Sequence, residues 1–460
     1  MIRILHIIPQ LSGAGPTRSL LAAIKYARQP NLPQQHRVIT LESQAYPIAL
    51  ISAKRLGVTV IRQPNPSTLN AEIENADIVQ VHFWNHPRLY ELLQKDLPPN
   101  RLLLWLKIVG HQPPQIVSPE LVKLADLLVP TSPETLKLPV MRNYATSVVP
   151  GIADFERLHQ ISLLPHSGFN VGYIGTTNFS KMHPQYISMH AGLNIPDLQV
   201  IVCGGKNPEL EQQAQEYGII EKFQFRGYVE NIKTVLAQLD VFGYPLCAET
   251  YATSEKSLQE AMYAGIPPVV FPYGGVKHIV EDGKTGLLVS SLEAYQKAIT
   301  YLYNHPQERQ RLGKNARQFI QSNFSPEKAV TQLATLYNQL LTQPKHQRKL
   351  SGFSATPAQK FIFSLGTTAE EFAQSYQDDN LDILLAADQK IASASTLLAQ
   401  GEGGVVQYRN YYPNDCFLRF WSGLILHKQG KKQSAIAEWQ AAIKLGFPHP
   451  RIHDYLAQAV

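Results

Sequence analysis

One polar segment of the chain, ETYATSEKSLQEAM (249–262), holds several side chains that can bind a ligand. It lies between the apolar runs VFGYPL (241–246) and PPVVF (267–271), so a loop and the start of a helix are expected between two strands. The hydroxyls of Thr253 and Ser254 stand where this helix begins. Because free amides at a helix N-terminus attract phosphate oxygens, we expect both residues to face a diphosphate.

Three carboxylates in the same segment are expected to have different roles. Glu260 lies within the helix, and its two acceptor oxygens suit the paired hydroxyls of a ribose. Ser257 and Glu260 also have the Ser-x-x-Glu spacing of a capping box, which is a purely structural alternative. Glu255 is expected at the rim of the site or in the first helical turn, where a negative charge suits the helix dipole. Glu249 is expected to fold back toward the same site.

Glycines and a lysine extend the expected site beyond this segment. Gly15, in the loop LSGAGPTRSLL (11–21) after the first predicted strand, allows a tight turn and the close approach of a ligand. Gly274 and Gly275 follow a later strand in the same way. Lys181 follows the strand FNVGYIG, where it is either a phosphate ligand at the mouth of a cleft or a solvated surface lysine.

The elements that must position these residues form two series of apolar runs. The first contains RILHII (3–8), ADIVQVH (76–82) and LLLWLKIVG (102–110), and the second contains FNVGYIG (169–175) and LQVIVCGG (198–205). Runs that are apolar throughout suit strands buried on both faces of a parallel sheet. Because helical stretches separate them, each series predicts a doubly wound α/β domain, whose ligands sit at the carboxyl ends of the strands.

We therefore predict two Rossmann-like domains over 1–160 and 161–341, a linker over 342–356 and a small all-α domain over 357–460. The last domain contains an amphipathic helix in KKQSAIAEWQAAIKLGFPHP, which pairs with the preceding FLRFWSGLILHKQG. The pair resembles a tetratricopeptide repeat, and an ordinary helical hairpin is the alternative. Six residues fall at or next to the repeat's usual small, aromatic and proline positions: Gly423, Gly430, Ala435, Trp439, Ala442 and Pro448.

The composition is that of a globular protein. The 460 residues are 44% hydrophobic and 17% charged, and the net charge of +6 is too diffuse to indicate a nucleic-acid partner. Cys203, Cys247 and Cys416 form no metal or disulfide pattern, so we expect a reducing, cytoplasmic setting and no metal site. No apolar run reaches the roughly 20 residues that cross a bilayer. The basic linker near Lys345 and Arg348 allows at most peripheral contact with the inner face of a membrane.

The segments after residue 249 resemble a known family. EAMYAGIPPVVF, the following Gly-Gly pair and EDGKTGLLV together look like the C-terminal half of retaining GT-B glycosyltransferases of the glycosyltransferase 4 type. GYIGTTNFSK, VVPGIADFERL, ADIVQVH and SGAGPTRSLL extend the resemblance over about residues 1–340. It implies an N-terminal acceptor domain and a C-terminal domain that holds a nucleoside diphosphate sugar, which is a co-substrate rather than a cofactor. It also implies that Glu260 binds the donor ribose and that Lys181 binds the phosphates.

The resemblance suggests roles for three histidines at strand ends. His111, after the strand LLLWLKIVG, is matched with the family's N-domain histidine near the donor sugar. His111 and Glu260 are therefore the predicted catalytic residues. His82 and His86 are expected to line the acceptor side, and a structural or solvated histidine is the alternative at each position.

The chain departs from the family pattern at three positions. The family usually has a glutamate eight residues before the one matched by Glu260, where this chain has Ala252. Thr176 stands where an arginine is frequent, and His278 stands where a glutamate is common. Lys256 and Lys206 are the candidates to supply the missing positive charge. These changes concern donor recognition and activity more than the fold.

Together these features predict a metal-independent glycosyltransferase of the hexosyltransferase type that moves a sugar to an acceptor hydroxyl with retention of anomeric configuration. The acceptor is a glycan, a lipid-linked molecule or a protein, and the helical tail is a possible site for a protein partner. The main alternative is a non-catalytic interaction protein with a degenerate donor site. A sugar-nucleotide epimerase ranks last, because the additional acid and base residues that it needs are not evident.

Overall fold

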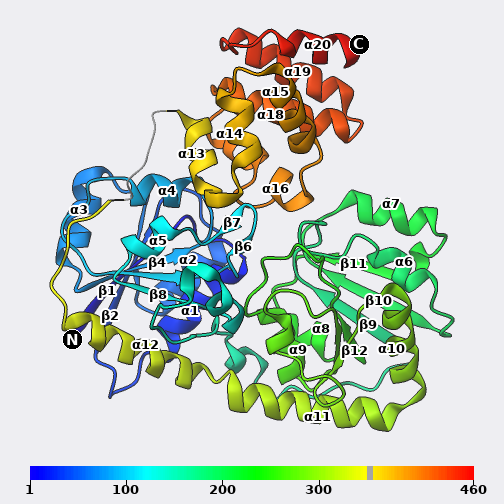
Figure 1. Ribbon diagram of the computed structural model, residues 1–460. Helices are drawn as coiled ribbons and strands as arrows, with labels where there is room; N and C mark the ends of the chain where they lie inside the picture. The colour runs from blue at the N-terminus through cyan, green and yellow to red at the C-terminus, as the bar shows by residue number, and fades with distance from the viewer. Residues whose placement is uncertain (350–355, 460) are drawn as a thin grey trace.

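The computed structural model describes residues 1–349 and 356–459. Figure 1 shows two α/β bodies side by side and a helical body that lies against the first of them. We call them the first body, the second body and the helical body. Within the described residues, no helix is both long enough and apolar enough to cross a membrane.

The first body is built on a six-stranded parallel sheet with the order β3-β2-β1-β4-β5-β8. Its central strands are apolar on both faces because helices cover both sides. The strands are β1 (Ile2–Ile8), β2 (Gln34–Thr40), β3 (Thr59–Arg62), β4 (Ile78–Phe83), β5 (Leu102–Leu106) and β8 (Leu127–Val129). The helices are α1 (Gly15–Tyr26), α2 (Pro47–Arg55), α3 (Pro66–Asn75), α4 (Pro87–Leu93) and α5 (Pro119–Leu124), and a short hairpin joins β6 (His111–Gln112) to β7 (Gln115–Ile116).

The second body repeats this plan with the order β11-β10-β9-β12-β13-β14, again all parallel. The strands are β9 (Phe169–Ile174), β10 (Leu198–Cys203), β11 (Phe223–Gly227), β12 (Val241–Gly243), β13 (Pro268–Val270) and β14 (Leu287–Leu288). The helices are α6 (Tyr186–Ala191), α7 (Pro208–Glu216), α8 (Ile232–Leu236), α9 (Lys256–Tyr263), α10 (Leu292–Asn304) and α11 (Pro306–Asn323). Short 3-10 helices also occur along the described residues: η1 (Pro133–Lys137), η2 (Pro139–Met141), η3 (Phe155–Leu158), η4 (Ile220–Lys222), η5 (Val276–His278) and η6 (Gly366–Thr368).

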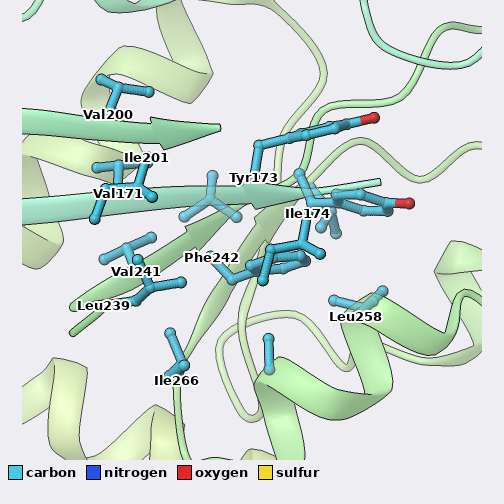
Figure 2. Close-up of a cluster of buried hydrophobic side chains, with 14 of the residues drawn as sticks. Val171, Tyr173, Ile174, Val200, Ile201, Leu239, Val241, Phe242, Leu258 and Ile266 are labelled. Atoms are coloured by element: carbon cyan, nitrogen blue, oxygen red, sulfur yellow. The ribbon is translucent and has the colours of Figure 1, made fainter. Parts of the chain in front are cut away.

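The core of the second body fixes the position of α9. Figure 2 shows Val171 and Ile174 of β9 with Phe242 of β12 in one buried cluster, to which Leu258 of α9 also belongs. Because Leu258 is fully buried there, α9 is held with its first turn at the carboxyl ends of the strands. In both sheets the strand order reverses beside the first strand, which is where ligands of such folds bind. The predicted fold class, two Rossmann-like bodies followed by helices, is confirmed.

The chain crosses between the two bodies twice. Ile152 belongs to the core of the first body and Ala153 to the core of the second, so the first crossing lies there. Helix α12 (Pro326–Leu341) then returns to the first body, where the Tyr337 hydroxyl donates to the buried Gln80 side chain at 2.6 Å. The predicted boundary at 341 thus differs from the structure, because α12 packs on the first body although it follows the second in sequence.

The predicted linker lies along the first body as far as residue 349. Arg348 pairs with Asp126 at 2.8 Å, and the Lys345 ammonium donates to a backbone carbonyl of α3. These cations are therefore engaged by the protein itself. The remaining linker residues that the prediction included, 350–355, lie outside the described part.

The helical body contains α13 (Pro357–Ser364), α14 (Glu370–Gln377), α15 (Leu381–Ala392), α16 (Thr396–Gln400), α17 (Val405–Tyr411), α18 (Cys416–Lys428), α19 (Lys432–Lys444) and α20 (Arg451–Ala459). Helices α18 and α19 form the predicted hairpin. They approach closely because Gly423 has no side chain: a Cβ there would lie 2.3 Å from the indole nitrogen of Trp439. That the hairpin is a tetratricopeptide repeat stays a prediction.

Candidate active site

The first turn of α9 lies at the seam between the two α/β bodies. The Ser254 hydroxyl donates to the Thr131 carbonyl at 2.7 Å and accepts from the Gly151 amide at 2.9 Å. The residue after Gly151 is also held by a serine: the Ser19 hydroxyl of α1 accepts from the Ile152 amide at 3.0 Å. The Ser254 hydroxyl therefore joins the two bodies, whereas the sequence predicted that it faces a diphosphate.

Glu260 is buried at this seam, with 1% of its surface exposed. Its Oε1 atom pairs with Arg18 of α1, and the Arg157 guanidinium lies 3.8 Å from the same oxygen. Its other oxygen, Oε2, is buried and has no hydrogen-bond partner. The capping-box alternative is wrong, because α9 begins at Lys256 and has no side-chain cap. Oε2 is thus a buried acceptor left without a partner among the described residues.

Glu255 and Lys181 form a second pair at the seam. The Lys181 ammonium lies 2.7 Å from Oε2 of Glu255, and the Tyr244 hydroxyl donates to the same oxygen at 2.6 Å. Burial acts to raise the pKa of Glu255, but the Lys181 cation and the hydrogen bonds outweigh it and lower that pKa. Glu255 is therefore ionised and holds Lys181 beside the first turn of α9.

Two further lysines lie at the seam, and neither has an ion-pair partner among the residues that the structure describes. A Cβ on Gly15 would lie 3.1 Å from Nζ of Lys256, so this side chain lies directly against the loop after β1. Burial lowers the pKa of Lys256 to about 8; the charges of Arg18 and Lys181 act in the same direction, while Glu255 opposes them. The Lys107 ammonium, just beyond β5, lies 3.0 Å from the centre of the Trp105 ring. Its Nζ atom is buried and has no hydrogen-bond partner within residues 1–349 and 356–459, and burial together with the Lys256 charge lowers its pKa well below the usual value.

We call these five basic side chains the seam cluster: Arg18, Lys107, Arg157, Lys181 and Lys256. Among the described residues, the carboxylates that pair with the cluster are Glu255 and Glu260. Positive charge therefore exceeds negative charge in a place where water screens it poorly. Such an arrangement favours a bound anion with at least two charges, and a diphosphate has that character.

The remaining residues of the predicted donor site shape the loop before α9. Glu249 is exposed, and no ion pair or hydrogen bond in the described structure joins it to the seam cluster. Thr253 is buried. Gly274 and Gly275 pack against the backbone of this loop: the Gly275 amide donates to the Ala252 carbonyl at 2.7 Å, and a Cβ on Gly275 would lie 2.0 Å from the Thr253 carbonyl oxygen. The two glycines thus hold the loop in place through its backbone.

The three predicted histidines do not come together. His82 is fully buried in the first sheet, where its Nε2 lies 3.2 Å from Nδ1 of His6, so it does not line an acceptor surface. His86 is buried as well; its Nδ1 accepts from the first turn of α4, and its Nε2 lies 3.2 Å from the Tyr411 hydroxyl of the helical body. His111 is exposed on the β6–β7 hairpin. Burial lowers its pKa, and the nearby Glu134 opposes this effect.

Sequence reasoning missed three members of the seam cluster. Arg18 stands in the quoted loop GAGPTRSLL and Lys107 in the run LLLWLKIVG, so both were visible as single charges beside strand ends. Arg157 lies in the crossing segment that the family resemblance already included. These three side chains lie close together only because of the relative orientation of the two α/β bodies. The spacing of residues in the sequence does not specify that orientation.

Comparison with known proteins agrees with this architecture. Residues 154–319 match the family model described as Glycosyl transferases group 1. The structure of HepE from Anabaena, solved with UDP, covers 74% of this chain and 100% of its own at a TM-score of 0.59 and 16% identity. Sucrose-phosphate synthase from Thermosynechococcus elongatus gives a TM-score of 0.57 at 18% identity over the same 74% of the chain. The two α/β bodies have the GT-B fold.

Curated relatives of this GT-B chain include two bacterial proteins. The D-inositol 3-phosphate glycosyltransferase of Corynebacterium urealyticum is 27% identical over 199 residues, which are 40% of this chain and 46% of that protein. Spore coat protein SA of Bacillus subtilis is 23% identical over 311 residues, 58% of this chain and 80% of that protein. The match to the first relative thus spans less than half of its length, and the helical body lies beyond the family model.

Proposed function

We propose that the protein is a glycosyltransferase that transfers a sugar from a nucleoside diphosphate sugar to an acceptor hydroxyl. The observation that carries this proposal is the seam cluster, in which five basic side chains lie near two carboxylates at the carboxyl ends of both sheets. The group 1 glycosyl transferase pattern over residues 154–319 supports the same reaction. HepE was solved with UDP and glucose, so uridine diphosphate sugars are the first donors to test.

The chemistry follows from where charge develops. The bond between the anomeric carbon and the diphosphate oxygen breaks, and a bond to the acceptor oxygen forms. The departing diphosphate gains negative charge, which Lys181, Lys256 and Arg18 are positioned to stabilise. We propose that the acceptor proton passes to the leaving phosphate on the same face of the sugar, so that the anomeric configuration is retained.

Glu260 is proposed to bind the donor ribose. Its buried Oε2 atom has no partner, and the ribose hydroxyls are donors that would satisfy it. Arg18 holds the other oxygen and so fixes the orientation of the carboxylate. His111 is proposed to act on the donor sugar from the first body, although it lies on an exposed hairpin beside Glu134 and Lys277.

A nucleotide-sugar screen tests the proposal. A donor that binds the folded protein raises its melting temperature by mass action. Glu260→Gln, which keeps the shape of the side chain, is expected to weaken binding of that donor by about tenfold or more, since an ionised acceptor is lost. Glu249→Gln is the matched control, because Glu249 is exposed. The proposal fails if no nucleotide sugar is bound or hydrolysed, or if both variants behave alike.

We also propose that transfer needs no metal ion, since the seam cluster already supplies positive charge at the site. Transfer from the identified donor is expected to continue after dialysis against EDTA. Among the described residues, no group of three or more His, Cys, Asp or Glu side chains is arranged to hold a metal ion. Loss of transfer in EDTA that added Mg²⁺ or Mn²⁺ restores would contradict this part of the proposal.

A further inference from the structure

Glu134 of the first body contacts the second body directly. It lies in η1, shortly after β8, and its Oε2 atom is 2.9 Å from Nε2 of His278 and 3.0 Å from the Lys277 ammonium. Both partners belong to η5 of the second body, and Lys137 of η1 approaches the same oxygen at 3.2 Å. Burial acts to raise the pKa of Glu134, but these basic neighbours lower it to about 2. One ionised carboxylate therefore joins η1 to η5, and we call its contact with Lys277 and His278 the η1–η5 contact.

Within the second body, η5 is packed against the loop before α9. The His278 amide donates to the Gly275 carbonyl at 3.0 Å, and the Gly275 amide donates to the Ala252 carbonyl at 2.7 Å. Gly274 has a φ of +56°, and a Cβ there would lie 2.7 Å from the Ala252 carbonyl oxygen. Because backbone meets backbone here with no side chain between, a shift of η5 is transmitted to this loop.

The same loop contacts the first body at a second point. The Ser254 hydroxyl donates to the Thr131 carbonyl, and Thr131 precedes Glu134 by three positions. The segment after β8 therefore holds the loop directly through Thr131 and indirectly through Glu134 and η5. The loop ends at Glu255, which lies 2.7 Å from the Lys181 ammonium. The position of this ion pair thus depends on both contacts.

The two contacts are expected to differ in their response to salt. The side chains of Glu134 and Lys277 are 16% and 37% exposed, so dissolved ions reach them. Ser254 is buried, with 4% of its surface exposed. Because salt screens exposed charges far more than buried groups, added salt weakens the η1–η5 contact selectively.

An uncharged contact between the bodies lies on the other side of the seam cluster. The Tyr228 ring, just after β11, would be 3.3 Å from a Cβ on Gly13 of the first body, and it meets Tyr46 edge-on with 5.6 Å between ring centres. In the second sheet β9 and β12 stand between β11 and β13, and Lys181 and Lys256 follow these two central strands. Since η5 follows β13, the seam cluster is flanked by the aromatic contact on one side and by the η1–η5 contact on the other.

We propose that Glu134 is a positioning residue whose η1–η5 contact closes the two α/β bodies over the first turn of α9. In the closed arrangement, the loop before α9 keeps Glu255 and Lys181 in place for a donor diphosphate. Without the η1–η5 contact, the bodies stay together at Tyr228 and separate more often on the side of η5. The effect on a donor rests on the proposed function, whereas the closure does not.

Small-angle X-ray scattering of the ligand-free protein measures this closure. Glu134→Gln removes the charge and keeps the shape of the side chain, so its radius of gyration at low salt is expected to exceed that of the wild type. Raising NaCl from about 0.01 M to about 1 M shortens the Debye length from about 30 Å to about 3 Å and is expected to expand the wild type more than Glu134→Gln. Glu308→Gln is the matched control, because Glu308 also pairs with a basic residue three positions later, Arg311, but within α11.

A charge exchange tests whether the two side chains act on each other. Lys277→Glu places a second carboxylate beside Glu134 and is expected to expand the protein more than Glu134→Gln does. The double variant Glu134→Lys/Lys277→Glu restores opposite charges, so it is expected to recover the wild-type radius at low salt. Recovery by exchanged charges would not occur if Glu134 only filled space.

Calorimetric titration with UDP measures the consequence for the donor site. Glu134→Gln is expected to bind UDP about two- to fivefold more weakly, which is the factor that a partly exposed ion pair contributes. The double variant is expected to recover the affinity, and Glu308→Gln is expected to bind UDP as the wild type does.

The inference is overturned if Glu134→Gln and Glu308→Gln have the same radius and the same response to salt, or if the double variant stays as expanded as the single variants. An unchanged affinity for UDP in an expanded Glu134→Gln protein would overturn the positioning role. Closure that responds as expected in a protein that binds neither UDP nor any nucleotide sugar would leave the η1–η5 contact in place and reject the glycosyltransferase proposal instead.

Discussion

Burial lowers the pKa of Lys256 in the seam cluster to about 8, so its charge changes within an accessible pH range. A diphosphate binds the protonated ammonium and raises its pKa, so affinity for UDP is expected to fall as the pH rises through about 8. Below that pH the free protein is already protonated and the affinity levels off. Calorimetric titration with UDP between about pH 6.5 and 9.5 measures this dependence.

Lys256→Met is expected to remove most of that pH dependence and to weaken UDP binding. Lys284→Met serves as the control, because the Lys284 side chain is 73% exposed. An unchanged slope of affinity against pH in Lys256→Met would assign the titration to another group.

Lys107 offers a test in which stability and binding change in opposite directions. Its buried Nζ has no hydrogen-bond partner among the described residues, and leaving a buried polar group unpaired costs free energy. Lys107→Met keeps the length of the side chain against Trp105 and is expected to raise the free energy of unfolding by about 1–3 kcal/mol. The same change is expected to weaken UDP binding. Urea unfolding and UDP titration measure the two effects; a less stable Lys107→Met protein would mean that the ammonium is already satisfied.

For single residues, the sequence identified which charged side chains belong to the site better than it identified the residues with which they pair. Lys181, Glu255 and Glu260 were all found as candidates, because charged residues beside strand ends are visible in the sequence. Their partners were not, since Arg18 lies 242 positions from Glu260. The Ser254 hydroxyl, expected at a phosphate, is used between the bodies instead. Helix-start patterns are local, whereas these pairings depend on the tertiary arrangement.

The elements that attach the helical body provide a prediction about packing. Gly403 and Gly430 both have φ of +76°, but a Cβ at Gly403 meets Asn85 whereas at Gly430 nothing lies within 4 Å. Gly403→Ala therefore combines backbone strain with a steric clash, and Gly430→Ala has the strain alone. We expect Gly403→Ala to lose at least about 1–3 kcal/mol more stability than Gly430→Ala in chemical unfolding.

The effect of Gly403→Ala is expected to be local to the contact between the α16–α17 loop and Asn85. Limited proteolysis is expected to cut near the α16–α17 loop faster in Gly403→Ala than in Gly430→Ala, since the loop no longer fits against Asn85. Equal stability and equal cleavage of the two variants would show that the loop is not held by this contact.

Strands and helices could be predicted because their signals are periodic and local. Continuous apolar runs identified the strands of both sheets, and the segment at 249–262 indicated where α9 begins. The packing of α12 on the first body could not be predicted, because an amphipathic helix specifies that it buries one face but not which surface covers it. The docking of the helical body on the first body could not be predicted either. Its hydrogen bonds involve Asn85 and Gln115, which are single polar residues that belong to no recognisable sequence pattern.

For the whole molecule, Ser254 tests how strongly the two α/β bodies are held together. Ser254→Ala removes the hydrogen bonds to Thr131 and Gly151, each worth about 0.5–1.5 kcal/mol. We expect small-angle X-ray scattering to give a larger radius of gyration for Ser254→Ala than for the wild type without ligand, and a saturating donor to restore the smaller value. Ser188→Ala, at a half-buried serine of α6 whose hydroxyl donates within one body to the Gln185 carbonyl, is the control. An unchanged radius would show that other seam contacts suffice.

The two crossings between the bodies have a mechanical consequence. One crossing lies at Ile152–Ala153 and the other between α11 and α12, so two covalent links join the same pair of rigid units. Two links leave rotation about the line through them as the easiest relative motion and resist twisting and sliding. Because the helical body is fixed to the first α/β body, it moves as part of that body. Opening would then carry the helical body and the first α/β body away from α9 as one unit, with the docking contacts at Asn85 and Gln115 intact.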